Sequence, residues 1–312
     1  MHQHTPSLSL STSPVPLAAF DADGDAPVEP GVDQRWSTWT SVTKGQRGPE
    51  PRPDWVVTAD AALDTELGVL KTGKEADVFL VERAVPGDPD RRSLLAAKRY
   101  RGRDHRQFHR DGEYTDGRRT RRTRDQRAIE DRKSSWGKAM AATQWADAEF
   151  LALSRLWDAG APVPYPVQID GTEILLEFVG QESADGTAVA APRLARTRPG
   201  PGQLADWFDQ LRHGMCVIAR LGWAHGDLSP YNILVDGLVD GRADGGDGLG
   251  DDVDDGGRLV IIDLPQVVDL VANPFGADLL HRDCRNVCTW FASRGLDVDP
   301  DELFADVFAQ AW

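Results

Sequence analysis

The sequence predicts an α+β fold in two lobes, with a β-rich N-terminal half and a helix-rich C-terminal half. Short apolar runs joined by Gly- and Pro-containing turns occur within residues 54–98, and one long helical pattern begins at residue 134. Beyond residue 200, helical patterns dominate and apolar runs are short. The 312 residues are enough for two structural units, at about one per 150 residues.

The N-terminal half is expected to begin with antiparallel strands, which are predicted at residues 69–70, 77–81 and 94–98. Residues 134–159 repeat apolar side chains at helical spacing, and Gly160 and Pro162 follow as stop signals. The segment 169–179 reads as two short strands around an Asp-Gly turn. These elements predict a sheet accompanied by one long helix.

The C-terminal half is expected to be mostly helical. Residues 203–222 form an amphipathic pattern, and a final helical region begins near Pro274. Two apolar runs, 233–235 and 259–263, are predicted as buried strands. The lobes therefore divide as 54–180 and 181–312.

Three segments differ from this folded pattern. Residues 1–53 hold eight of the twenty prolines and are predicted to be a disordered tail. One or two of Trp36, Trp39 and Trp55 are expected to dock on the folded body. Residues 99–133 form an Arg-rich insertion of thirteen Lys and Arg against seven Asp and Glu. Residues 236–258 form an acidic insertion of eight Asp and eight Gly.

Composition excludes several classes of protein. No apolar run approaches the ~18 residues of a membrane helix. Three cysteines are too few for a disulfide scaffold, and with no charged secretory start they favour the cytoplasm. A net charge of -15 argues against a general nucleic-acid coat protein, although it permits a local basic patch.

The most specific motif is the octet HGDLSPYN at residues 225–232, which an apolar run follows at once. It has the form H-x-D-x-x-x-x-N of a kinase catalytic loop, in which the Asp orients the acceptor hydroxyl and the Asn holds a metal ion. By itself an HGD can be an ordinary turn. The whole octet assigns catalysis to Asp227 and metal binding to Asn232.

Two further charged residues fit the same chemistry. Asp263 ends an apolar run, where a carboxylate can ligate Mg²⁺ bridging nucleotide phosphates, although the usual D-F-G triplet is absent. Lys98 ends the run LLAAK and is similar to the lysine that contacts α- and β-phosphates. Its expected ion-pair partner is Glu149 on the long helix, with Glu130 as a weaker candidate.

Two backbone segments are candidates for nucleotide contact. The turn containing Thr72, Gly73 and Lys74 could bring N–H groups close to phosphates, although a plain β-turn explains it equally well. The strand that ends at Gly180 could act as a hinge, with the backbone of Glu177 and Val179 pairing with adenine. An ordinary hairpin strand is the alternative reading.

In this order the motifs resemble the RIO family of atypical serine protein kinases, in the branch without an N-terminal winged helix. The resemblance covers about residues 55–295 and rests on TGKEA (72–76), AAKRY (96–100), WADAEF (145–150), PVPYP (162–166), LEFVG (176–180), HGDLSPYN (225–232), IIDLPQ (261–266) and LHRDCRNV (280–287). One departure is Gly226, where the family usually has Ser or Ala.

The resemblance implies a reduced bilobal protein-kinase-like fold without a conventional activation segment, and phosphorylation of serine with ATP and Mg²⁺, or Mn²⁺ in its place. By resemblance, Thr72 and Lys74 touch phosphates, Lys98 binds them with Glu149 positioning it, and Asn232 and Asp263 hold the metal. It also implies autophosphorylation, and ATP hydrolysis through a phosphorylated Asp263.

Two other functions remain open from the sequence. One is a small-molecule kinase of the aminoglycoside type, which shares the HGD loop but lacks TGKEA. The other is a nucleotide-gated RNA- or ribosome-binding factor that uses residues 99–133, unless this insertion is only a solvated loop.

Overall fold

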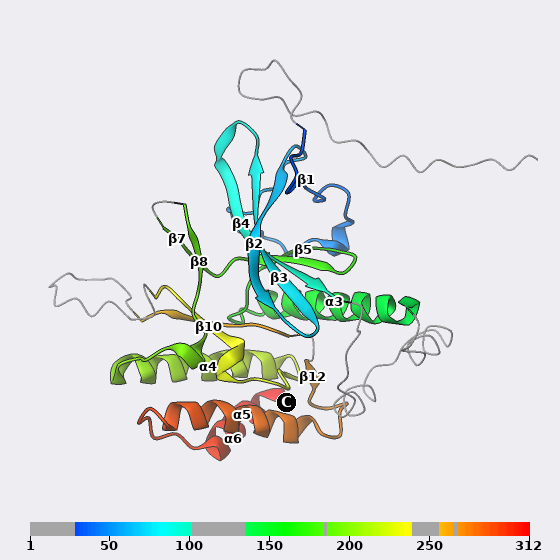
Figure 1. The fold of residues 1–312 in the computed structure, drawn as a ribbon. Coiled ribbons are helices and arrows are strands. Elements are labelled where there is room, and N and C mark those ends of the chain that lie inside the picture. The colour runs from blue at the N-terminus through cyan, green and yellow to red at the C-terminus, as the bar shows by residue number, and fades with distance from the viewer. Residues whose placement is uncertain (1–28, 102–134, 184–185, 239–255, 265–266) are drawn as a thin grey trace, which may run out of the picture.

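The computed structural model describes residues 29–101, 135–183, 186–238, 256–264 and 267–312. It has two lobes stacked on one another, with the sheet in the upper lobe of Figure 1 and most helices in the lower one. Most of the Arg-rich insertion, most of the acidic insertion and residues 1–28 lie outside the described ranges. Within those ranges, no helix is both long and apolar enough to cross a membrane.

The N-lobe is a six-stranded antiparallel sheet in the order β1-β2-β3-β4-β6-β5. Its strands are β1 (Gln34–Trp36), β2 (Leu63–Thr72), β3 (Ala76–Val85), β4 (Asp88–Tyr100), β5 (Pro166–Asp170) and β6 (Glu173–Glu177). The predicted strands of this half are thus confirmed, although they extend further than their apolar runs.

Alternation along β4 sorts its side chains between two environments. Leu95 and Ala97 are buried in a cluster that includes Trp39 and Tyr165. Lys98 lies on the opposite face, because neighbouring residues of a strand point to opposite sides. The pleat of β4 therefore directs this lysine toward the C-lobe.

Helix α3 (Ser135–Asp158) crosses beneath the sheet (Figure 1). Ala142, Ala146, Phe150 and Leu153 are buried at spacings of three and four residues, which places them on one helical face. Glu149 shares this buried stripe, with 1% of its surface exposed. The predicted long helix is confirmed, and its one deeply buried carboxylate among the described side chains faces the core.

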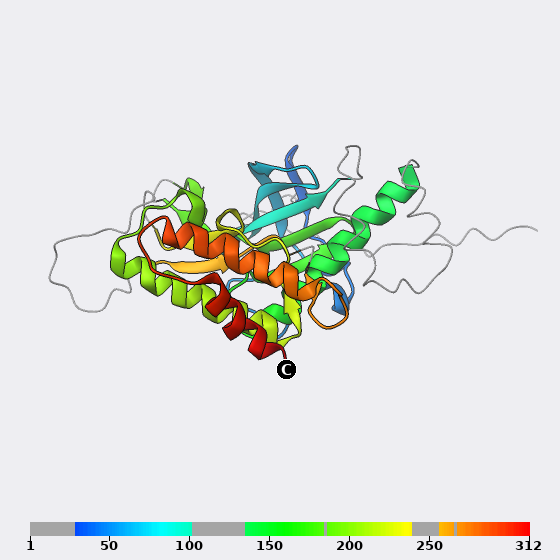
Figure 2. The ribbon, with the colours of Figure 1, turned by 90° about the horizontal axis from the view of Figure 1, so that it is seen from below.

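The C-lobe is built on α4 (Pro201–Arg220), α5 (Gly276–Ala292) and α6 (Pro300–Phe308), with α6 in contact with both others (Figure 2). Its two-stranded pairs are β7 (Gly180–Glu182) with β8 (Ala188–Ala190), β9 (Trp223–Ala224) with β12 (Val268–Asp269), and β10 (Ile233–Asp236) with β11 (Arg258–Ile261). Short 3-10 turns are η1 (Lys44–Gln46), η2 (Leu194–Arg196), η3 (Pro230–Asn232) and η4 (Ala309–Ala311).

The prediction of a disordered tail through residue 53 is wrong for residues 29–53. The segment 29–62, here called the N-terminal strap, pairs with the sheet through β1 and buries Trp39 to 4% exposure. Trp55 packs against the same cluster, which agrees with the expected docking of one or two tryptophans. Composition does not reveal that these residues are ordered, because the strap has no core of its own and gains its apolar contacts only from the sheet.

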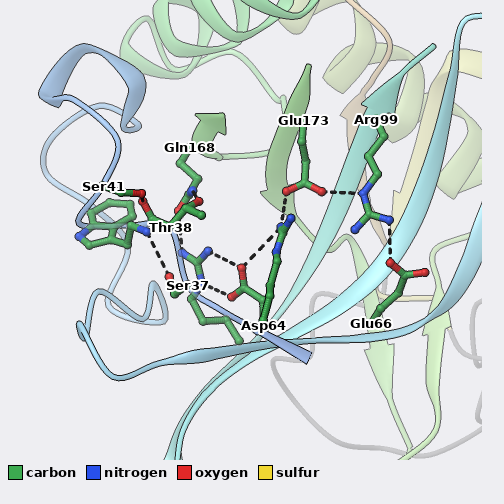
Figure 3. Close-up of polar contacts among 11 residues, drawn as sticks. Ser37, Thr38, Ser41, Asp64, Glu66, Arg99, Gln168 and Glu173 are labelled. Carbon is green, nitrogen blue, oxygen red and sulfur yellow. Dashed lines mark hydrogen bonds and ion pairs between the residues drawn. The ribbon is translucent and has the colours of Figure 1, made fainter. Parts of the chain in front are cut away.

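A buried polar network also ties the strap to the sheet (Figure 3). Arg83 on β3 is fully buried and donates to both carboxylate oxygens of Asp64 at 2.6 and 2.9 Å. It also donates to Gln168 at 2.8 Å, and Gln168 donates to Thr38 of the strap at 2.7 Å. Because each charged group has a partner, the network can lie in the interior.

Candidate active site

A cavity of about 810 Å³ lies between the lobes and gathers residues that are far apart in the sequence. Its wall includes nine of the ten predicted site residues: Gly73, Lys74, Lys98, Glu149, Glu177, Val179, Asp227, Asn232 and Asp263. Thr72, the tenth, is exposed at the end of β2 and does not line the cavity. The structure therefore brings nearly the whole predicted site together.

Lys98 bridges the two lobes at the back of this cavity. Its Nζ lies 2.7 Å from Glu149 Oε1 on α3 and 2.8 Å from Asp263 Oδ1. Burial by itself lowers the pKa of Lys98, but the two carboxylates outweigh it and hold that pKa above its ordinary value. Lys98 is therefore a permanent cation, and the expected pairing with Glu149 is present.

Glu149 does more than neutralise this lysine. Its Oε1 also accepts a hydrogen bond from the backbone N–H of Leu264 at 3.2 Å, and its Oε2 accepts from the Tyr100 hydroxyl. Three donors from β4 and from the residue after Asp263 thus converge on one buried carboxylate. This sharing lets a single side chain of α3 set the position of both Lys98 and the Asp263 segment.

The catalytic loop is held by its own backbone and by the neighbouring strand. Asn232 Nδ2 donates to the Asp227 carbonyl at 2.9 Å, and His225 Nε2 lies 3.1 Å from the Ile262 carbonyl. Ile262 N–H in turn donates to the Asn232 carbonyl at 2.9 Å. These bonds join the loop to the chain just before Asp263, so that both predicted metal ligands belong to one rigid unit.

Helix α5 supports the loop from below. Asp283 accepts hydrogen bonds from the backbone N–H groups of Gly226 at 2.7 Å and Leu228 at 2.8 Å. Burial raises the pKa of the Asp283 carboxyl to about 6, although His225 and these two N–H groups oppose that rise. Sequence reasoning missed this role of Asp283, because nothing local shows that α5 passes under residues 226–228.

The backbone conformation of the catalytic loop favours glycine at position 226. Its φ is +81°, a left-handed conformation that costs a side-chain-bearing residue about 1–2 kcal/mol. The departure from the family's usual Ser or Ala therefore matches the backbone observed in this chain.

Asp263 has an unusual backbone for an aspartate. The predicted strand 259–263 ends at Ile261, and Asp263 has a φ of +70°. Non-glycine residues rarely adopt this region and often do so at functional sites. Burial tends to raise the pKa of Asp263, but Lys98 outweighs it and lowers that pKa to about 2, so the carboxylate is ionised at neutral pH.

The donor set fits Mg²⁺ bound together with a nucleotide. Magnesium is usually held by one or two protein carboxylates or amides, with phosphates and water completing the shell. Asp263 uses Oδ1 for Lys98, and Asn232 uses its amide nitrogen for the Asp227 carbonyl, so one oxygen of each remains for a cation. No cluster of three or more acidic, His or Cys ligands occurs in the described ranges, as expected for a site completed by phosphates.

The two backbone segments also face the cavity. At the turn after β2, Gly73 N–H donates to the Ala76 carbonyl at 3.0 Å, and a Cβ on Gly73 would lie 2.7 Å from that oxygen. At the hinge, the Val179 carbonyl accepts from Ala191 N–H at 3.0 Å, whereas Val179 N–H has no partner within the described chain. The hinge thus leaves one backbone donor available to a ligand.

Cys284 and Cys288 lie on α5, do not line this cavity and are buried in the main core. Burial raises the pKa of both thiols, Cys288 to about 11. They carry no chemistry of the site.

A comparison with solved structures supports the fold. A Rio2 kinase from Chaetomium thermophilum, described as an ADP/Mg²⁺-phosphoaspartate complex, superposes with a TM-score of 0.50 at 23% sequence identity. The superposition covers 78% of this chain and 62% of that one. The bilobal kinase-like architecture is therefore confirmed.

Sequence comparisons are more specific. The chain is 32% identical over 247 residues to the RIO-type serine/threonine-protein kinase Rio1 of Haloferax volcanii, covering 78% of this chain and 69% of the relative. It is 27% identical over 184 residues to mouse serine/threonine-protein kinase RIO3, but spans only 31% of that protein. The family model of the RIO domain matches residues 95–239 and 253–303. The matched segments span both lobes and contain Lys98, the catalytic loop and Asp263, and the chain therefore belongs to the RIO family of atypical protein kinases.

Proposed function

We propose that this chain transfers the γ-phosphoryl group of ATP to serine hydroxyls of a protein. The observation that carries the proposal is the bonding of Lys98 to both Glu149 and Asp263 beside the loop that contains Asp227 and Asn232. The similarity to a haloarchaeal serine/threonine-protein kinase supports the same activity. The small-molecule phosphotransferase is not favoured by these relatives.

Each residue has a role that its position supports. Val179 N–H and the Glu177 backbone receive the adenine, and the Gly73 turn with Lys74 approaches the phosphates. Lys98 binds the phosphates while Glu149 keeps it in place. Bound Mg²⁺ neutralises charge on the phosphates.

The residue that acts on the acceptor hydroxyl lies in the catalytic loop. Asp227 orients the acceptor hydroxyl and takes its proton as the oxygen attacks the γ-phosphorus, and ADP leaves. Positioning and electrostatic stabilisation carry most of the rate, because the protein forms no bond in this step. Asn232 and Asp263 would hold the metal, since each has one side-chain oxygen left for a cation.

A second activity, ATP hydrolysis through Asp263, is also proposed. Asp263 faces the cavity, is ionised and has a strained backbone. Attack of its carboxylate on the γ-phosphorus would release ADP, and water would then hydrolyse the acyl phosphate. The Chaetomium Rio2 complex is described as containing a phosphoaspartate, which supports this chemistry in a protein of similar fold.

One experiment separates the two activities. The full chain is incubated with γ-labelled ATP and Mg²⁺, and label is followed separately in the protein and in free phosphate. Acid-stable label on serine, by autophosphorylation or on an added substrate, supports the kinase. Hydroxylamine-sensitive label with release of free phosphate supports the ATPase. Absence of label in both pools contradicts the proposed function. Replacing Mg²⁺ by Mn²⁺ tests whether the second cation also works.

A contact between residues 99–133 and RNA or the ribosome remains a proposal from sequence alone. Only Arg99, Tyr100 and Arg101 of this insertion are described, and both arginines are engaged with carboxylates of the N-lobe. Binding of labelled RNA to the chain with and without residues 102–133 tests it.

A further inference from the structure

Five cationic side chains line the cavity, and four of them pair with no carboxylate of the described residues. Lys98 is bonded to Glu149 and Asp263. Within the described ranges, the other four make no ion pair: Lys71, Lys74, Arg193 and Arg196. Elsewhere on the N-lobe, arginines such as Arg92 and Arg99 are each paired with two carboxylates. Four cations of the cavity wall are therefore available to an anionic ligand.

Lys71 enters the cavity from the N-lobe. It lies on β2 opposite Val78 of β3, next to a break in the strand register and two residues before Gly73. It lines the cavity beside Val78, although the residue as a whole is exposed. This position lies next to the glycine turn, where the charges of Asp263, Arg193 and Lys98 act on the lysine.

Arg193 enters the same end from the C-lobe side. Its backbone bridges to Leu234 of β10, and its guanidinium donates to the carbonyl of Tyr231, the residue before Asn232. Arginine has five N–H donors, so most remain for a ligand after this bond. Arg193 is therefore oriented by the catalytic loop, next to Asn232 in the chain's hydrogen bonding and within the influence of Asp263.

The two cations share one electrostatic environment centred on Asp263. Partial burial lowers the pKa of Lys71, the nearby Arg193 lowers it further, and Asp263 acts in the opposite direction. Burial also lowers the pKa of Arg193, against the influence of Asp263. Since Asp263 also bonds Lys98, the charges of three cations act on this one carboxylate. A phosphate near Asp263 would meet two cations, Lys71 and Arg193, that form no ion pair with a carboxylate of the described ranges.

We propose that Lys71 and Arg193 bind the terminal phosphate of the nucleotide from opposite lobes, and that Arg193 stabilises the charge on the phosphoryl group during its transfer. This inference rests on the proposed use of ATP. The transferring group spreads charge over its equatorial oxygens, which planar guanidinium donors match well. Neither residue gains or loses a proton, since the acceptor proton goes to Asp227 and the β–γ bond breaks to release ADP.

The proposal predicts how the chain distinguishes nucleotides. ADP lacks the terminal phosphate, so it would keep its contacts with Lys98 and the hinge but lose those with Lys71 and Arg193. A hydrogen bond to a charged group contributes about 1.5–3 kcal/mol, which corresponds to roughly 10–100-fold in affinity. Removing either cation should therefore weaken the binding of the triphosphate more than the binding of ADP.

Calorimetry on the full chain provides the test, with Mg²⁺ and either ADP or the non-hydrolysable AMP-PNP. Lys71→Met and Arg193→Gln should each lower the affinity for AMP-PNP about tenfold or more and change the affinity for ADP less than twofold. Arg198→Gln is the matched control, because Arg198 is exposed on the same segment and does not line the cavity. Arg193→Lys should restore part of the lost affinity, and circular dichroism verifies that each variant folds.

Three results would overturn the proposal. Equal weakening of both nucleotides would mean a general electrostatic effect rather than a terminal-phosphate contact. Unchanged binding of both would assign these cations to the acceptor instead. Failure of the unmodified chain to bind either nucleotide would contradict the proposed function itself, and it is thereby distinguished from the first two outcomes.

Discussion

Lys98 Nζ lies 2.8 Å from Asp263 Oδ1, which joins the central strand of the N-lobe to the segment after β11. This bond crosses the boundary between the lobes. Glu149 accepts hydrogen bonds from both Lys98 and the Leu264 N–H. The protein itself therefore fixes the position of the phosphate-binding lysine relative to the predicted metal ligand Asp263. Such preorganisation lowers the reorganisation needed in the reaction.

Lys98→Met should abolish productive use of MgATP, with a loss of turnover of roughly 10²-fold or more, because the cation on the phosphates is removed. Tyr100 and Leu264 N–H still satisfy Glu149, so the variant should remain folded. Release of labelled phosphate and protein labelling measure the loss. Lys44→Met, at an exposed position of the strap, is the control. Wild-type turnover in Lys98→Met would contradict the site.

Asp263→Asn should remove turnover and also change how stability depends on pH. The pKa of Asp263 is lowered from 3.8 to about 2, so its ionised form stabilises the fold above pH 4, and this contribution is lost as the pH falls through about 2. The difference in Tm between the wild type and Asp263→Asn should therefore shrink as the pH falls from 4 toward 2. Thermal unfolding followed by circular dichroism measures it. A constant difference would exclude the pairing.

Asp227→Asn should spare nucleotide binding yet lower phosphoryl transfer by ~10²-fold or more, the effect expected when a positioned proton acceptor is removed. Calorimetry and labelling together separate the two quantities. Asp209→Asn, an exposed change on α4, should alter neither. If Asp227→Asn loses binding and transfer equally, Asp227 is instead a metal ligand or a structural residue.

Asp283→Asn should lower kcat with little change in the KM for ATP, because an amide cannot accept from both Gly226 and Leu228 as the carboxylate does. The pKa of Asp283 is raised from 3.8 to about 6, so its contribution to stability is full below pH 4 and is lost as the pH rises through 6. The Asp283→Asn variant should not show this loss of stability as the pH rises. Steady-state kinetics and unfolding at pH 4 and 7 measure both effects, and an unchanged kcat would contradict the positioning role.

Arg83→Ala should destabilise the fold by about 3–5 kcal/mol, because it removes both hydrogen bonds of Arg83 to the buried Asp64 carboxylate and leaves only the longer contact of 3.7 Å to Arg35. Arg92→Ala is the matched control on the neighbouring strand, where an exposed pair with Glu82 and Glu182 contributes only about 0–1 kcal/mol. Urea denaturation measures both free energies of unfolding. Similar small losses in the two variants would mean that the strap network is not needed for stability.

Local pattern was sufficient for much of the fold. The octet at 225–232, the apolar runs of the sheet and the helical period of 134–159 depend on neighbours in the chain, and each predicted element is present. The pairing of Lys98 with Glu149 could also be predicted, since one long helix offered a suitable acid next to the sheet. Thr72 is the one predicted site residue that does not line the cavity, and it is exposed at the end of β2.

The sequence by itself determined the order of the elements and the chemistry of the catalytic loop, because periodicity and motif spacing are local properties of the chain. Only the tertiary structure decided that residues 29–53 are ordered, that Asp283 anchors the loop, and that Lys71 and Arg193 meet near Asp263. These facts depend on contacts between segments far apart in the chain. Their energies come from burial and charge pairing that exist only after the lobes have packed.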